Sequence, residues 1–263
     1  MTLKQIKQTL TNDINQPLIT GFQKASSHSQ VLGAICKPAS DNYLKEIKMT
    51  QPAKKRLKPY IWVTWLASLM GEEKQCKYAA WFSAHYQFER DSNYDSCTHD
   101  EMVSQLAIQH KAQGFVVYVE DNNSFTINGK TCDIGGKLDI LVKVEGGQPI
   151  IIDCKLGKRK AAHRMQVLIY MLLFPLAPNG KRLCQGQTPV GRLVYPDGIV
   201  EIPSSEVDEQ FKEFFRQTVA IISSPSPPSQ APSRWECRYC NIPGAYCPAR
   251  IDPKADTGDH NLF

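Results

Sequence analysis

The sequence contains no apolar run near the ~20 residues that a helix needs to cross a bilayer. Its first residues, MTLKQIKQTLTNDINQ, lack the apolar segment of a secretory signal. An internal repeat and a long low-complexity segment are also missing from the chain. We therefore expect a cytoplasmic protein that has no membrane partner.

A strong excess of one charge is missing as well, because the formal net charge is only +5. This value permits an anionic partner such as nucleic acid but does not demand one. A basic stretch at 54–58 is interpreted as a solvated face, with phosphate contact as the alternative. Hydrophobic residues make up 42% of 263 residues, which is enough for one large domain with a real core.

Hydrophobic periodicity predicts an α/β chain, with a mixed sheet flanked by helices (an α+β mixed sheet). Helices are expected at 60–88 (two, interrupted near Gly71), at 99–113, at 161–174, and after a cap at Ser204 or Ser205. Strands are expected as a hairpin of 115–120 with 124–129, a hairpin within 136–155 that turns at 145–148, and a pair at 191–196 and 198–203.

Acidic and basic side chains collect at the end of the apolar run IIIDCK, which carries Asp153 and Lys155. A D-x-K triplet alone occurs about once by chance in a chain of this length. The hairpin, however, pairs positions whose numbers sum to roughly 292–294, which places Asp139 opposite about Asp153 to Lys155. Two adjacent carboxylates favour a bound cation over a surface ion pair. Gln166 and Tyr170 follow at i, i+4 on the next helix, where the polar Gln needs a hydrogen-bond partner.

Together, GKLD, Asp153-Cys154-Lys155 and Gln166-VLI-Tyr170 resemble the PD-(D/E)xK nucleases, more narrowly their RecB-like branch. The resemblance covers about residues 99–175. It implies a restriction-endonuclease-like core with Asp139 and Asp153 as Mg²⁺ or Mn²⁺ ligands, the Cys154 carbonyl as a possible third ligand, and Lys155 as the catalytic lysine. Gln166 and Tyr170 would support them.

That branch also uses a histidine on a helix before the first core strand. Two residues fit this position, His99 at the start of the helix and His110 near its end. We prefer His99 as the metal ligand. The other histidine would be an exposed or capped helix residue.

Three cysteines gather in the tail as Cys237, Cys240 and Cys247, beyond the Pro/Ser stretch at 223–233. RecB-like nucleases that resemble this chain place one further cysteine before the core, followed by a basic residue and an aromatic pair, as Cys76 is. The resemblance implies that these four cysteines hold a [4Fe–4S] cluster, with Zn²⁺ as the competitor. The cluster would dock a tail that has too little apolar surface to dock itself. Cys36 is the alternative fourth ligand, and Cys97, Cys132 and Cys184 are interpreted as ordinary residues.

The resemblance divides the chain into an unassigned extension (1–58), a RecB-like nuclease core with preceding helices (59–222), and a linker with a cysteine-rich tail (223–263). It implies a metal-dependent DNA nuclease that acts on single strands or ends, as an exonuclease in repair, recombination or CRISPR-type processing. DNA would be a partner, held by Lys158, Arg159, Lys160 and Arg164, with a helicase or CRISPR adaptation proteins as further partners. The alternatives are a non-catalytic DNA-binding or assembly subunit and a zinc-ribbon interaction module.

Overall fold

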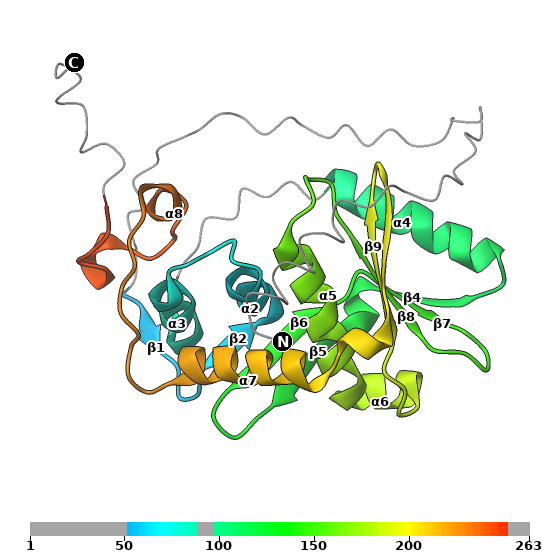
Figure 1. The fold of residues 1–263 in the computed structure, drawn as a ribbon, viewed down its shortest axis with the longest axis horizontal. Helices are drawn as coiled ribbons and strands as arrows, with labels where there is room; N and C mark the ends of the chain where they lie inside the picture. The colour runs from blue at the N-terminus through cyan, green and yellow to red at the C-terminus, as the bar shows by residue number, and fades with distance from the viewer. Residues whose placement is uncertain (1–51, 89–96, 252–263) are drawn as a thin grey trace, which may run out of the picture.

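The computed structural model describes residues 52–88 and 97–251 (Figure 1). Most of the expected extension, including Cys36, lies outside these residues, as does the end of the tail beyond Ile251. The helices are α2 (Val63–Met70), α3 (Lys77–His85), α4 (Cys97–Ala112), α5 (Ala161–Leu173), α6 (Pro178–Cys184), α7 (Glu209–Ser223) and α8 (Arg234–Arg238). The strands are β1 (Lys54–Lys55), β2 (Tyr60–Trp62), β3 (Tyr86–Gln87), β4 (Val116–Val119), β5 (Ser124–Asn128), β6 (Asp133–Lys137), β7 (Ile140–Lys143), β8 (Ile150–Cys154), β9 (Val190–Tyr195) and β10 (Gly198–Ile202).

A five-stranded mixed sheet in the order β10-β9-β8-β7-β4 forms the centre of the molecule. Strands β8 and β9 are parallel, and the other neighbours are antiparallel. The predicted β7–β8 hairpin is confirmed, with Ile140 opposite Ile152, so that paired numbers sum to 292. The predicted strand pair β9–β10 is also present. The fold class is therefore the expected one, a mixed sheet flanked by helices.

The hairpin predicted for residues 115–129 is wrong. Strand β4 pairs with β7, whereas β5 pairs with β6 in a separate three-stranded sheet of order β2-β6-β5. A 3-10 helix at Glu120–Asn123 replaces the expected turn and redirects the chain between the two sheets. Glu120 has a φ of 38°, and the Asn123 side chain donates a 2.8 Å hydrogen bond to the Tyr118 carbonyl, which holds this redirection in place.

Helices α4 and α5 cover opposite faces of the central sheet (Figure 1). Alternate residues of β8 divide between them, because strand side chains point to opposite faces with period two. Ile151 packs into the larger core with α5, and Ile152 and Cys154 pack against α4. Asp153 is therefore on the α5 side of the sheet, which fixes where its carboxylate can act.

The two helices expected at 60–88 are present, and α2 ends before Gly71 as predicted. A Cβ at Gly71 would lie 2.3 Å from the Ala162 nitrogen, so only glycine lets α2 approach the start of α5 this closely. Strand β2, which precedes α2 without a break, was not predicted.

Helix α7 begins later than predicted, because its cap is Asp208 and neither Ser204 nor Ser205. The Asp208 carboxylate accepts a 2.8 Å hydrogen bond from the Phe211 amide, whereas the two serines belong to a 3-10 helix at Ser204–Glu206. Helix α6 was missed, since only seven residues form it. None of the helices in the described ranges is long and apolar enough to cross a membrane.

Candidate functional site

Asp153 occupies the end of β8 with only 1% of its surface exposed. Its Oδ1 accepts a 3.2 Å hydrogen bond from Nε2 of Gln166 on α5. Its Oδ2 lies 2.7 Å from Nζ of Lys155, although the contact lacks the geometry of a directed hydrogen bond. The buried strand therefore holds an acid and a base in direct contact at its exit.

Gln166 connects the acid and the base through one amide group. Its Oε1 accepts a 3.1 Å hydrogen bond from Lys155 Nζ, and its Nε2 also donates to the Tyr170 hydroxyl at 3.1 Å. Tyr170 in turn donates to the carbonyl of Lys137 at 2.8 Å. A Cβ at Gly136 would lie 2.8 Å from the Tyr170 ring, so this glycine makes room for the tyrosine beside β6. The Gln166 amide thus connects Asp153, Lys155 and Tyr170 by hydrogen bonds.

Asp139 is placed differently from the prediction, because it lies in a bend between β6 and β7 and not inside a strand. The period-two alternation from Lys137 through Asp139 is broken there, and Lys137 instead forms an ion pair with Glu120 at 2.9 Å. Asp139 Oδ2 accepts a 2.7 Å hydrogen bond from the Cys154 amide and lies 3.2 Å from Nε2 of His99. The bend thus brings Asp139 to the same end of β8 as Asp153.

The electrostatics of the site follow from burial and from the crowding of acids. The hydrogen bond to the Asp139 carboxylate raises the pKa of His99 to about 9, against the opposing effect of burial. Burial raises the pKa of Asp153, the attraction of Lys155 opposes this rise, and the negative charge of Asp139 adds to it. Both shifts describe a site in which negative charge is unfavourable without a balancing cation.

His99 and His110 differ clearly in their surroundings. His99 lies at the start of α4 beside Asp139, whereas the His110 ring packs edge to face against Phe115, with centroids 6.1 Å apart. Burial lowers the pKa of His110, which is typical of a histidine in apolar surroundings. Only the preferred histidine of the two is therefore brought to the acids.

The donor set fits a hard divalent cation. His99 and the carboxylates of Asp139 and Asp153 lie at one end of the sheet, and Mg²⁺ and Mn²⁺ prefer carboxylate oxygens of this kind. Asp153 Oδ2 is buried without a directed hydrogen bond, which leaves a lone pair for a metal. The Cys154 side chain faces α4 instead, and burial raises its pKa to about 12, so only its backbone could contribute.

Two acids near His99 were missed by the sequence analysis. The ligand atoms of His99, Asp100 and Glu120 all lie within 4.8 Å of one another, the one such set of three or more among the residues that the structure describes. The His-Asp pair at the start of the predicted helix was the available signal for Asp100. Glu120 could not be found, because the sequence assigned it to a strand that was paired wrongly.

The four basic residues expected to hold DNA are not equivalent. Lys158 is exposed, Lys160 forms an ion pair with Glu73, and the Arg159 guanidinium lies 5.1 Å from the centre of the Tyr195 ring. Arg164 contradicts the prediction, because it is 5% exposed and both of its terminal contacts go to the carboxylate of Glu206. A guanidinium that is buried and doubly bonded in this way is structural and cannot reach a DNA backbone.

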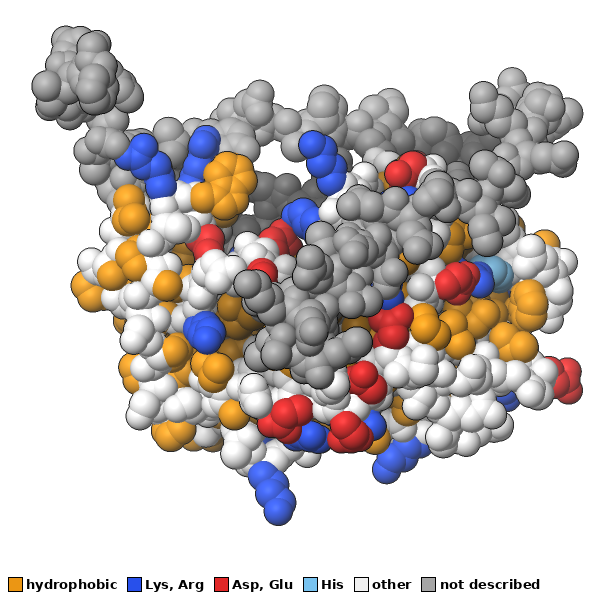
Figure 2. Space-filling model, viewed as in Figure 1, with side chains coloured by type: hydrophobic (Ala, Val, Ile, Leu, Met, Phe, Trp, Pro, Cys, Tyr) orange, Lys and Arg blue, Asp and Glu red, His pale blue; other side chains and the backbone are white. Residues whose placement is uncertain are grey.

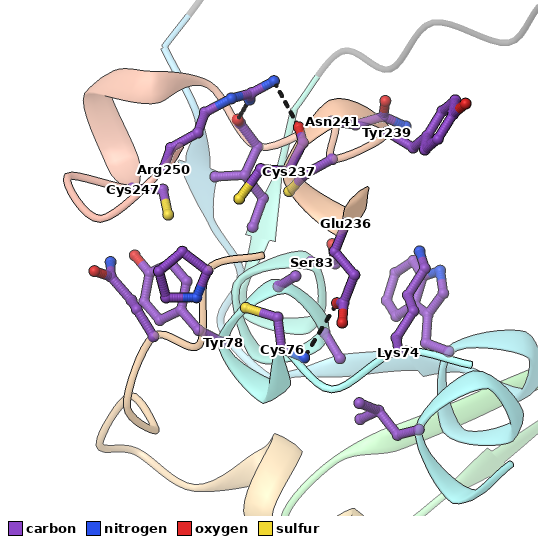
Figure 3. A pocket seen from close by; sticks show the side chains of 18 residues that line it. Lys74, Cys76, Tyr78, Ser83, Glu236, Cys237, Tyr239, Asn241, Cys247 and Arg250 are labelled. Carbon is purple, nitrogen blue, oxygen red and sulfur yellow. Dashed lines mark hydrogen bonds between the residues drawn. The ribbon is translucent and has the colours of Figure 1, made fainter. Parts of the chain in front are cut away.

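The four predicted cluster cysteines meet around one cavity of about 140 Å³ (Figure 3). Cys76 caps α3, Cys237 lies on α8, and Cys240 and Cys247 follow in the tail. The sulfurs of Cys76, Cys237 and Cys247 point toward a common space in Figure 3. The structure therefore brings together thiols that are more than 150 residues apart in the sequence.

A [4Fe–4S] cluster and Zn²⁺ both take four cysteine thiolates as ligands. This cavity, within the described residues, is lined by four such thiols. Among the other cysteines, Cys132 and Cys184 are buried thiols. Cys97 is disulfide-bonded, which differs from its interpretation as an ordinary residue.

The tail also makes contacts that the sequence did not predict. Ile242 and Cys247 are buried against Trp81 and Phe82, and Tyr78 donates a 2.6 Å hydrogen bond to the Tyr246 carbonyl. The Glu236 carboxylate accepts hydrogen bonds from the amides of residues 75 and 76 at the start of α3. The tail therefore meets α3 through apolar and polar contacts as well as through the cysteines.

The chain is similar to known proteins. Residues 46–248 match the family described as the PD-(D/E)XK nuclease superfamily. The chain is 29% identical over 142 residues to the CRISPR-associated exonuclease Cas4 of Saccharolobus solfataricus, an alignment that covers 51% of this chain and 61% of that relative, less than two thirds of its length. The solved structure of SSO0001 matches with a TM-score of 0.37 and 20% identity over 75% of this chain and 89% of that one.

Proposed function

This chain belongs to the PD-(D/E)XK nuclease superfamily, and from that premise we propose that it is a metal-dependent deoxyribonuclease, acting as an exonuclease on single-stranded DNA or DNA ends. The observation that carries the proposal is the contact between buried Asp153 and Lys155, bridged by Gln166 and placed beside Asp139 and His99. A surface ion pair would need neither the burial nor the bridging amide.

His99, Asp139 and Asp153 would hold Mg²⁺ or Mn²⁺, with the Cys154 carbonyl as a further ligand. Such an ion, when bound, lowers the pKa of its water and stabilises negative charge on a phosphodiester. Lys155 is positioned by Gln166 to orient the attacking water and to offset the charge that develops on the phosphate. Tyr170 fixes Gln166 through its own hydrogen bond, so the residues of α5 act as supports for those of β8.

The family resemblance of Cys76, Cys237, Cys240 and Cys247 favours a [4Fe–4S] cluster over Zn²⁺ at the cysteine cavity. These four thiols surround about 140 Å³. Such a cluster would tie the tail to α3 more strongly than the hydrogen bonds of Glu236 and Tyr78 do.

The biological setting is proposed from the relative whose printed name is CRISPR-associated exonuclease Cas4. DNA is the proposed substrate, and CRISPR adaptation proteins or a helicase are the proposed partners. Lys158 and Arg159, next to the catalytic strand, would contact the DNA backbone. The cytosol remains the location predicted by the sequence.

A digestion assay tests the activity. Wild-type protein should degrade labelled single-stranded or duplex DNA only with Mg²⁺ or Mn²⁺, and Asp153→Ala should lower the rate at least 100-fold, about 2.7 kcal/mol of barrier. Glu201→Ala is the matched control, because Glu201 is an exposed acid on β10 of the same sheet. Equal rates for wild type and Asp153→Ala would contradict the assignment as a nuclease and favour a non-catalytic DNA-binding subunit.

The metal content of anaerobically purified protein tests the cluster. A coloured, iron-containing wild type and a Cys237→Ser variant that lacks both the colour and the iron would support the cluster. Cys184→Ala is the control that should keep the colour, because Cys184 is a buried thiol elsewhere in the fold. Colourless protein with stoichiometric zinc would favour the alternative of a zinc-ribbon interaction module.

A further inference from the structure

Helix α8 and its C-cap Tyr239 expose two aromatic rings beside the cysteine cavity. Trp235 is 70% exposed and Tyr239 is 48% exposed. Their rings meet edge to face with centroids 5.2 Å apart, and the Arg238 guanidinium lies 5.7 Å from the centre of the Tyr239 ring. Exposed Trp and Tyr of this kind usually indicate a binding surface.

The residues of α8 divide into two faces by helical spacing. Trp235 and Arg238 occupy i and i+3 on one side of the helix, and Tyr239 follows as its C-cap, with its ring against that of Trp235. Glu236 and Cys237 turn the other way, Glu236 onto the start of α3 and Cys237 into the cavity. In Figure 3 the Tyr239 ring points away from the thiols. The inward face anchors the helix, whereas Trp235 on the outward face presents most of its ring to solvent.

The positive charge of the outward face indicates an anionic partner. Arg234 and Arg238 flank the aromatic rings, and the one acid of α8, Glu236, is engaged with backbone amides. Figure 2 shows an apolar patch beside basic side chains over α8. Aromatic rings interleaved with arginines are the chemistry that binds single-stranded nucleic acid, because every base has a face that can stack.

We propose that Trp235, Tyr239 and Arg238 form a platform on which unpaired bases of a nucleic acid strand stack, away from the catalytic strand β8. The platform rests on the proposed nuclease function and adds a second contact for its substrate. Trp235 supplies the open ring face, Tyr239 supports it edge to face, and the two arginines attract the phosphates. Stacking on such a surface tolerates any base sequence.

Binding of labelled oligothymidine by full-length protein tests the platform, in a cleavage-deficient Asp153→Asn background. Trp235→Ala should weaken binding about tenfold, the loss expected for one stacked base. The same variant should bind an abasic strand of equal length as the parent does, because that strand keeps its phosphates but has nothing to stack. Trp235→Phe should recover most of the affinity.

Leu176→Ala is the matched control, because Leu176 is also a large exposed apolar residue (53%) but lies elsewhere on the fold. Melting temperature and visible absorbance should be the same in all variants, which separates lost stacking from a lost tail. The platform is overturned if Trp235→Ala binds thymidine strands as the parent does, or if its affinity for the abasic strand falls equally. The patch would then be a contact for another protein. Wild-type cleavage with Mg²⁺, measured in parallel, shows whether the nuclease assignment stands in either case.

Discussion

The backbone amide of Cys154 donates a 2.7 Å hydrogen bond to Oδ2 of Asp139, although Asp139 lies in a bend between β6 and β7 and not in a strand. The same oxygen lies 3.2 Å from Nε2 of His99. These two contacts, from the end of β8 and from the start of α4, orient the Asp139 carboxylate beside Asp153. The geometry of the site therefore depends on a bend and a helix end as much as on the central hairpin.

The His99–Asp139 contact predicts how the stability of metal-free protein depends on pH. The pKa of His99 is raised to about 9 by the Asp139 carboxylate, above its unfolded value of 6.5. A group whose pKa is raised on folding contributes stability that is complete below pH 6.5 and is lost as pH rises toward 9. We expect His99 to contribute on the order of 2 kcal/mol that disappears over this range, after allowance for solvent screening of a half-buried ring.

Urea unfolding of chelator-treated wild type and His99→Gln between pH 6 and pH 9.5 measures this contribution. Their difference in unfolding free energy should shrink as pH rises, and the subtraction removes the titration of other groups, such as the cysteines. A constant difference across the range would show that His99 is not protonated in the folded protein.

Asp153 should limit stability at the same time as it supports activity. Burial raises the pKa of this acid, so its ionised form costs increasing free energy as pH rises above the unfolded value of 3.8. At pH 8 and without metal, Asp153→Asn should therefore be more stable than wild type by on the order of 1–2 kcal/mol. The attraction of Lys155 is already included, since the pKa is raised in spite of it.

Mn²⁺ should reverse this order. A metal at 100 times its dissociation constant adds about 2.7 kcal/mol to a protein that binds it, and Asp153→Asn should gain much less. Thermal unfolding with and without Mn²⁺ measures both effects. The role of Asp153 as a metal ligand is contradicted if Mn²⁺ stabilises the variant as much as wild type.

The sequence predicted the parts of this site that depend on local periodicity. The turn at 145–148 sets the β7–β8 register, and the i, i+4 spacing of Gln166 and Tyr170 follows from any helix at this position. Contacts between distant segments could not be derived this way. Glu120 is brought near His99 by the 3-10 helix that separates two sheets, and nothing in FVVYVEDNNSF distinguishes that geometry from a hairpin turn.

Arg164 illustrates the same limit for charge. It belongs to a run of basic residues that is typical of a DNA-binding surface. Its position on α5, however, directs its side chain inward to Glu206, which lies 42 residues later in the sequence. The position of Glu206 depends on how β10 and α7 pack, which helical spacing alone does not give. The cysteines were grouped by the family resemblance, because spacing alone left Cys36 and Cys76 open as the fourth ligand.

Gln166 is expected to act as a positioning residue. Gln166→Ala removes the acceptor of Lys155 and a donor to Asp153, and losses of supporting contacts of this type lower activity 10- to 100-fold. Loss of the donor should also raise the pKa of Asp153, so the acidic limb of the pH–rate profile should move to higher pH. A purely structural role would lower the rate without moving this limb.

Tyr170→Phe provides the comparison for Gln166. It leaves the Lys137 carbonyl without its buried donor, which costs about 1–3 kcal/mol of unfolding free energy. The direct contacts of Gln166 with Lys155 and Asp153 are kept in this variant, so activity should fall less than in Gln166→Ala. Urea unfolding and single-turnover cleavage of both variants separate stability from positioning.

Lys158 and Arg164 should respond oppositely to substitution, although they are six residues apart in one basic run. Lys158→Ala should leave stability unchanged, weaken DNA binding, and lower the slope of log affinity against log salt by about 1, because one phosphate contact is lost. Arg164→Gln should leave the salt slope unchanged and lower the unfolding free energy by about 3–5 kcal/mol, because Glu206 is left without its partner. Replacing both Arg164 and Glu206 by Met should recover much of that loss, since two apolar side chains need no ion pair. A reduced salt slope in folded Arg164→Gln would instead place this arginine on the DNA.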